Sequence, residues 1–151
     1  MHQIPPPATV FLGHHAPQQR AEPRFRTVLE TYQQSGGLAL AEEILAMLDG
    51  KCSPDIARLA RWIVERHVVS FYCNSDTWIP LFQFNRLDMS VRPELAPVLA
   101  ELNNVYDRWD LAMWFAKPNA ALADRSPVQV FATDPTEVLH AARLDRFIAN
   151  G

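Results

Sequence analysis

The sequence predicts a mainly α-helical protein, in which a helix-turn-helix-like lobe with a small β-hairpin precedes a second domain built from helices. Three observations support this prediction. Apolar residues recur at helical spacing, for example in 40–48 and 95–102. Proline follows a good N-cap residue at several expected helix starts, such as Ser126 and Asp134. Two β-rich runs, "VVSFYC" and "TWIPLFQF", flank one short turn.

Length and composition limit the classes of protein to which the chain can belong. The chain has 151 residues, 48% of them hydrophobic and 21% charged, with a formal net charge of −3. This size allows one ordinary domain or two small lobes with a shared core. The negative charge excludes a polycation that coats nucleic acid. Cys52 and Cys73 are too few for a disulfide framework, and no signal peptide or membrane-spanning run is found. We therefore expect a cytoplasmic protein that does not contact a membrane.

The first elements follow in chain order. Residues 1–24, rich in Pro, Gln and His, are expected to form a flexible arm. A helix is expected over 25–32, ended by Ser35-Gly36-Gly37. The stripe formed by Leu40, Ile44, Leu45 and Leu48 then predicts a helix that closes at Asp49-Gly50.

A second helix, 54–67, is predicted by Ser53 as N-cap and Pro54 at the first helical position. Its expected core stripe is Ile56, Leu59, Ala60 and Ile63, with Arg58, Arg61 and Glu65 opposite. Trp62 and Arg66 lie off this stripe, and we expect them at an interface, either between the arm and the helix-turn-helix or between two subunits. Two short helices joined by a tight turn form a helix-turn-helix arrangement, and the hairpin after them has the plan of a wing. This lobe is predicted to span 25–84.

The remaining residues, 85–151, are predicted to form the helical domain. The segment 93–102 is amphipathic, and Asp107 can cap the helix that follows it. That helix is apolar nearly all round after Asp110, so it must be buried on most sides by its own fold or by a partner. Capping boxes at Ser126–Gln129 and Asp134–Glu137 predict a short helix and a final helix that ends near Ala149.

The sequence predicts no enzyme, no cofactor and no metal site. It contains no GxSxG, P-loop, GxGxxG or HExxH pattern. Asp107 and Asp110 could be paired carboxylates, but capping at a helix start is the favoured interpretation. His14-His15 lacks a third ligand at a usable spacing, and Cys52 has no histidine or acid in a suitable sequence context.

Nucleic-acid binding is a second possibility that the residues leave open. The candidate DNA contacts are Arg58, Arg61 and Arg66 on the second helix of the lobe. Residues 35–73 hold four basic and five acidic side chains, a poor balance for neutralising phosphates. The arrangement could equally be a retained scaffold or a dimerisation surface. Because DNA contact by one such helix is useful only when two are paired, we expect a homodimer.

Five segments follow one another in a fixed order. They are "TWIPLFQFN", "VRPELAPVLAELN", "DRWDLAMWFAKPNAAL", "RSPVQVF" and "DPTEVLHAA". The motif positions within them are Pro80, Phe82, Gln83, Phe84, Pro93, Trp114, Pro118, Asn119, Leu122, Ser126 and Pro127. In this order and spacing the segments resemble the Xre/MbcA/ParS-type antitoxin family, whose members carry a C-terminal toxin-binding domain. The similarity covers roughly 38–149.

The resemblance implies an antitoxin that neutralises a RES-domain toxin, an enzyme that consumes NAD, by docking its C-terminal domain on it. Family complexes commonly repress their own operon, so operator DNA is a further expected partner. The implied toxin-binding residues are Trp114, Phe115, Pro118, Asn119, Leu122 and Arg125. If they are presented to the toxin, Leu122→Ala should leave the fold nearly intact. Each could instead belong to the core.

One departure from the family pattern concerns the loop before Ser126. Relatives often carry glycine there, in an L-x-G-x-x-P turn, whereas this chain has Ala123-Asp124-Arg125. Two alternatives to an antitoxin remain open, a stand-alone DNA-binding transcriptional regulator and an orphan interaction scaffold.

Overall fold

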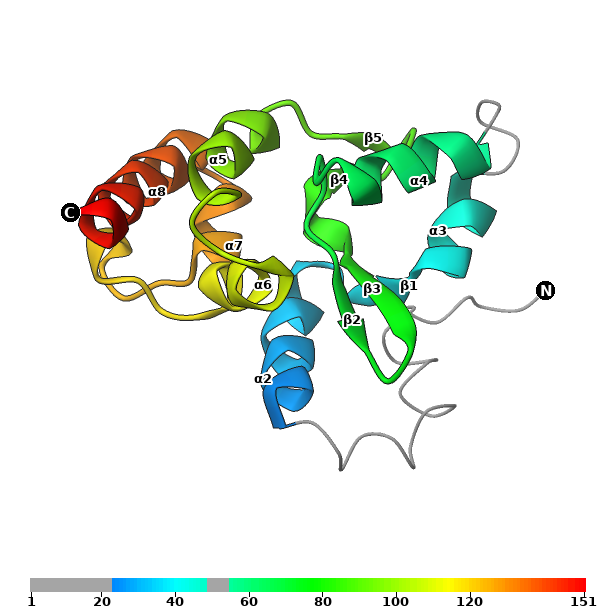
Figure 1. The fold of residues 1–151 in the computed structure, drawn as a ribbon, viewed down its shortest axis with the longest axis horizontal. Coiled ribbons are helices and arrows are strands. Elements are labelled where there is room, and N and C mark those ends of the chain that lie inside the picture. Colours follow the sequence, from blue (N-terminus) through cyan, green and yellow to red (C-terminus); the bar gives the residue numbers. More distant parts are fainter. Residues whose placement is uncertain (1–22, 49–54) are drawn as a thin grey trace.

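A computed structural model describes residues 23–48 and 55–151 (Figure 1). The first half of the chain alternates helices with short strands. Its elements are α2 (Pro23–Tyr32), η2 (Gln33–Ser35), β1 (Leu38–Leu40), α3 (Ala41–Leu48), α4 (Asp55–Val64), β2 (Phe71–Cys73), β3 (Asp76–Pro80) and η3 (Leu81–Gln83).

The second half is helical apart from a short strand pair at its start. Its elements are β4 (Phe84–Asn85), β5 (Ser90–Val91), α5 (Leu95–Leu102), α6 (Arg108–Ala116), η4 (Ala120–Leu122), α7 (Pro127–Phe131) and α8 (Pro135–Asn150). The prediction of a mainly helical protein is confirmed, and the expected hairpin is part of a small antiparallel sheet. Most of the expected arm, 1–22, and the expected turn and N-cap at 49–54 lie outside the described residues, whereas Pro23 and Arg24 already belong to α2.

The sheet is antiparallel, with strand order β1-β3-β2. The predicted hairpin is formed by β2 and β3, and its turn residues Asn74 and Ser75 have left-handed φ values of 51° and 71°. Such a turn matches the right-handed twist of the two strands. The tight hairpin therefore agrees with the turn expected between the two β-rich runs.

Two features of the sheet region differ from the prediction. Leu38–Leu40, expected to open a helix, forms strand β1 beside β3, because all three residues are buried against the sheet. The second β-rich run was expected to reach Phe84, but it bends into η3 after Pro80, and Phe84 then pairs with Val91 of β5. Pairing with a distant strand overrides local helical periodicity here.

The motif residue Gln83 explains how this bend is held. Its side chain is fully buried, and its Oε1 accepts a hydrogen bond from Val69 N at 2.7 Å. Its Nε2 donates to Val69 O and to Pro80 O, both at 2.9 Å. A buried amide with its hydrogen bonds made avoids the cost of an unsatisfied polar group. This glutamine therefore has a structural role at the entry to β2.

Helix α4 is rotated relative to the predicted stripe. Leu59 is buried and Ile63 half-buried, but Ile56 and Ala60, expected in the core, are exposed. The helix ends at Val64 and not at His67, because Arg66 adopts a left-handed φ of 56°. The core therefore lies on the side of Leu59, and the exposed face of α4 is partly apolar.

The main hydrophobic core crosses the predicted boundary at residues 84 and 85. One buried cluster combines α2 and the sheet with α5, α6, α7 and α8, and a smaller one lies between α3, α4 and β3. The Tyr32 hydroxyl, at the end of α2, donates to Ala112 O in α6 at 2.8 Å. Figure 1 shows α2 directly beside α6. The two-domain division stays a prediction, but α2 packs with the helical half.

Candidate functional site

Helix α6 and the loop after it carry most of the residues expected to bind a toxin. Asp107 caps the helix, because its carboxylate accepts a hydrogen bond from Asp110 N at 2.8 Å, which confirms the capping interpretation. The helix ends at Ala116, and Lys117 is extended before Pro118. Proline has no N–H to continue a helix, and the residue before it favours extended backbone.

Trp114 and Phe115 belong to the core of this chain. Phe115 is fully buried, with its ring centroid 5.1 Å from that of Phe82. Trp114 is buried too and meets Phe115 edge-on at 5.0 Å. The nearly all-round apolar surface of α6 is therefore covered by the protein's own fold, and in this conformation neither ring is presented to a partner.

Trp114 and Asn119 meet at one carboxylate of α8. Trp114 Nε1 donates to Asp145 Oδ2 at 2.6 Å, and Asn119 Nδ2 donates to the same oxygen at 3.1 Å. We call these three residues the Asp145 cluster. It ties the end of α6 and the start of the loop to α8. Asp145 was not among the residues singled out from the sequence, since it lies 26 residues from Asn119 and 31 from Trp114.

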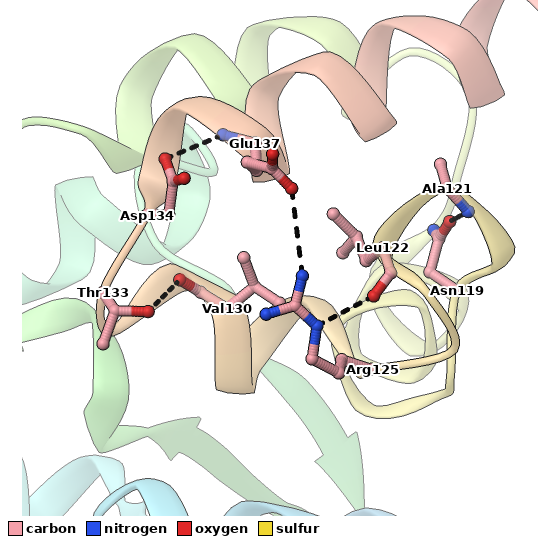
Figure 2. A network of polar contacts seen from close by, with 8 residues as sticks. All are labelled: Asn119, Ala121, Leu122, Arg125, Val130, Thr133, Asp134 and Glu137. Atoms are coloured by element: carbon pink, nitrogen blue, oxygen red, sulfur yellow. Dashed lines mark hydrogen bonds and ion pairs between the residues drawn. The ribbon is translucent and has the colours of Figure 1, made fainter.

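The loop 119–125 is closed by its own backbone. Asn119 N donates to Arg125 O at 3.0 Å, and Asp124 N donates to Asn119 O at 2.9 Å. Asn119 Oδ1 also accepts from Ala121 N at 2.9 Å, as Figure 2 shows. Ala123 and Asp124 both take left-handed φ values, 56° and 64°. These bonds hold a backbone conformation that costs about 1–2 kcal/mol per residue.

Leu122 requires a correction. It was expected to be presented to a partner, but its side chain is only 1% exposed and lies in the main core. Replacing it with alanine would remove buried apolar volume, so Leu122→Ala should destabilise the protein by about 2–5 kcal/mol instead of leaving the fold intact.

The remaining loop residues reach the surface. Pro118 is exposed and Asn119 half-buried. Arg125 is exposed, but its guanidinium is engaged, because Nε donates to Leu122 O at 2.9 Å and Nη2 lies 3.9 Å from Glu137 Oε1 (Figure 2). Of the six residues expected at a toxin interface, the structure therefore exposes Pro118 and Arg125 and leaves Asn119 half-buried.

An exposed apolar face at the end of α8 was missed in the sequence. Leu144, Phe147 and Ile148 are 47%, 75% and 65% exposed and share one face of the helix at i, i+3 and i+4. We call these three residues the α8 face. Glu101 of α5 holds the same helix, since Arg146 Nη1 lies 2.9 Å and Arg143 Nε 3.3 Å from its carboxylate. The i, i+3 and i+4 spacing of these apolar residues is visible in the sequence, but such spacing ordinarily indicates a helix face that packs in the core.

The three expected DNA contacts have different environments. Arg58 stacks over the ring of Trp62, with its guanidinium carbon 5.0 Å from the centroid, while Arg61 is exposed. Arg66 donates to two carbonyl oxygens, Asn103 O at 3.1 Å and Tyr106 O at 2.9 Å. Trp62 itself packs on Phe84. These contacts of Trp62 and Arg66 are to neither the arm nor a second subunit, so the interface expected there stays a prediction.

Within residues 23–48 and 55–151, no group of three or more His, Cys, Asp or Glu side chains is arranged to hold a metal ion. Each helix in this part of the chain is too short or too polar to cross a lipid bilayer. Comparison of the chain with protein-family models, curated proteins and solved structures gives no match.

Proposed function

We propose that the protein is a non-catalytic cytoplasmic antitoxin that binds and neutralises an NAD-consuming RES-domain toxin through its C-terminal half. The motif order supports this family, and the structure supplies a surface suited to such a role. The proposal includes a homodimer that contacts operator DNA when bound to its toxin.

The observation that carries the proposal is the α8 face. A soluble helix ordinarily keeps its apolar side against the core, yet Phe147 and Ile148 project from the last turns of α8. Contiguous exposed apolar side chains are typical of protein interfaces, and an aromatic at the centre of one often dominates the binding energy. The α8 face is attached to a fixed helix, so little ordering entropy is lost on binding.

Co-expression with a RES-domain toxin encoded beside this gene tests the proposal. The wild-type protein should restore growth and co-purify with the toxin. Phe147→Ser plus Ile148→Ser should weaken binding by at least about 2 kcal/mol and abolish rescue, with an unchanged melting temperature. Leu87→Ser, which alters an exposed apolar residue between β4 and β5, is the matched control and should rescue normally. Normal rescue by the double variant would contradict the proposal.

DNA contact has support of its own in the order of elements. A helix, a strand, two packed helices and a hairpin follow one another in 23–80, and the first strand pairs with the last. This order supports the proposal of a winged helix-turn-helix. Helix α4 exposes the apolar Ile56 and Val64 as well as Arg61, which suits a dimer contact better than phosphate neutralisation. Binding to promoter DNA without any binding to the toxin would favour the stand-alone regulator.

A further inference from the structure

A polar pocket of about 340 Å³ lies beside the loop 119–125. Its lining includes Glu30 in the last turn of α2 and Gln34 of η2. Asp124 of the loop, Gln129 of α7 and Pro118 line the same pocket. Residues nearly a hundred positions apart therefore line one hollow, next to the part of the chain that resembles a toxin-binding segment.

The charged side chains that line this pocket are acidic. Its lining includes two carboxylates, Glu30 and Asp124, and no basic side chain. In the described part of the chain, neither carboxylate forms an ion pair or a side-chain hydrogen bond. Arg125, the next residue after Asp124, makes its contacts with Leu122 O and Glu137. The pocket therefore presents two acceptor groups that nothing in this part of the protein neutralises.

The backbone that carries the two carboxylates is held before any ligand arrives. Asp124 has a left-handed backbone, and its N–H is bound to Asn119 O at 2.9 Å. Glu30 lies on a helix whose last residue, Tyr32, is bound to α6. A fixed backbone loses little conformational entropy when the acceptors that it carries bind a donor. The two carboxylates thus line the same hollow from two fixed segments of the chain.

We propose that this pocket receives an arginine side chain of the protein partner, an inference that rests on the proposed function. A guanidinium carries five N–H donors in a planar fork, which suits two separate carboxylates better than the compact ammonium of lysine. Pro118 and Ala116 provide apolar surface for the face of the guanidinium plane. The α8 face would supply apolar contact, and this pocket would supply charge recognition.

A model compound tests the pocket without any toxin. N-acetyl-arginine amide is titrated into the isotope-labelled full chain while backbone amide shifts are followed by NMR. Shifts should move at Thr31, Gln34 and Gln129, which line the pocket. The neutral isostere N-acetyl-citrulline amide should cause no such shifts, and Glu30→Gln plus Asp124→Asn should abolish the response to arginine. Asparagine tolerates a left-handed backbone, so the variant should keep the loop. Equal shifts with both compounds, or none with arginine, would overturn the proposal.

The complex provides the second measurement. Glu30→Gln plus Asp124→Asn should weaken toxin binding roughly tenfold, about 1.4 kcal/mol, and reduce its salt dependence. Glu42→Gln plus Glu65→Gln removes the same charge from exposed positions elsewhere and should leave affinity unchanged. If the wild type binds toxin and the pocket variant binds equally well, the assignment to a partner's arginine is wrong. If the wild type binds no toxin, the proposed function fails, and the arginine titration alone decides whether the pocket recognises a guanidinium.

Discussion

Glu43 is a carboxyl group whose surroundings disfavour its charge. Burial in the first turn of α3 raises its pKa from 4.5 to about 7, and the neighbouring charge of Glu42 adds to this, while a backbone hydrogen bond at Leu40 opposes it. Its Oε1 is buried with no hydrogen-bond partner. Desolvation therefore dominates. The folded protein binds this proton more tightly than the unfolded chain, so stability falls as the pH rises from 4.5 to 7.

Replacing this carboxyl with an amide should remove that pH dependence. We expect Glu43→Gln to be more stable than the wild type above pH 7 and to lose this advantage below pH 4.5, where the wild-type carboxyl is neutral in both states. Urea unfolding at both ends of this range measures the difference. Glu42→Gln, at the exposed neighbour, should give a smaller change. An advantage of Glu43→Gln that is the same at all pH values would refute a titrating carboxyl.

At the scale of elements, the sequence predicts what is encoded locally. The caps of α6, α7 and α8 each join residues three apart, so Asp107, Ser126 and Asp134 could be identified without a structure. Strand β1 could not, because Leu38–Leu40 depends on pairing with β3 some 40 residues later in the chain. The candidate functional site was predicted less well for the same reason, because distant elements determine which side of an apolar helix is buried.

The Asp145 cluster illustrates such a non-local interaction, and it leads to a prediction for the loop. Asp145→Ala leaves Trp114 Nε1 and Asn119 Nδ2 without their shared acceptor, so we expect a loss of about 1–3 kcal/mol in unfolding free energy. Amide exchange at Asn119 and Asp124 should quicken as the loop loosens. His140→Ala, at an exposed position on the same helix, is the control. A stability within about 0.5 kcal/mol of wild type would show that the cluster does not hold the loop.

At the scale of the whole molecule, two regions that looked separable in the sequence share one core. Phe25, Tyr32 and Phe82 from the first region lie in the same buried cluster as Leu111 and Phe131 from the second. Phe82 packs on both Phe115 and Phe131, at 5.1 and 5.6 Å. An apolar layer of this kind makes independent unfolding of either part unfavourable. A partner bound at the α8 face would therefore stabilise the region around α2 as well.

Arg66 joins two parts of the chain through polar contacts. These contacts allow a structural role of this arginine to be distinguished from a role in DNA binding. Its guanidinium donates to Asn103 O and Tyr106 O, and Asn103 Nδ2 donates back to Arg66 O at 3.0 Å, so three hydrogen bonds join the turn after α4 to the turn after α5. Removing the side chain leaves two carbonyls without these donors and relaxes a left-handed backbone that asparagine or glycine would tolerate better.

We expect Arg66→Ala to lower the unfolding free energy by about 1–3 kcal/mol in urea, because the hydrogen bonds between the two turns are lost, and to unfold in one transition. Arg61→Ala, which removes the same charge from an exposed position of α4, should stay within about 0.5 kcal/mol of wild type. A double-mutant cycle with Asn103→Ala should show coupling, since the two residues exchange hydrogen bonds. If Arg66→Ala is as stable as Arg61→Ala, the guanidinium does not join the two turns in solution and is free to serve as the DNA contact that the sequence predicted.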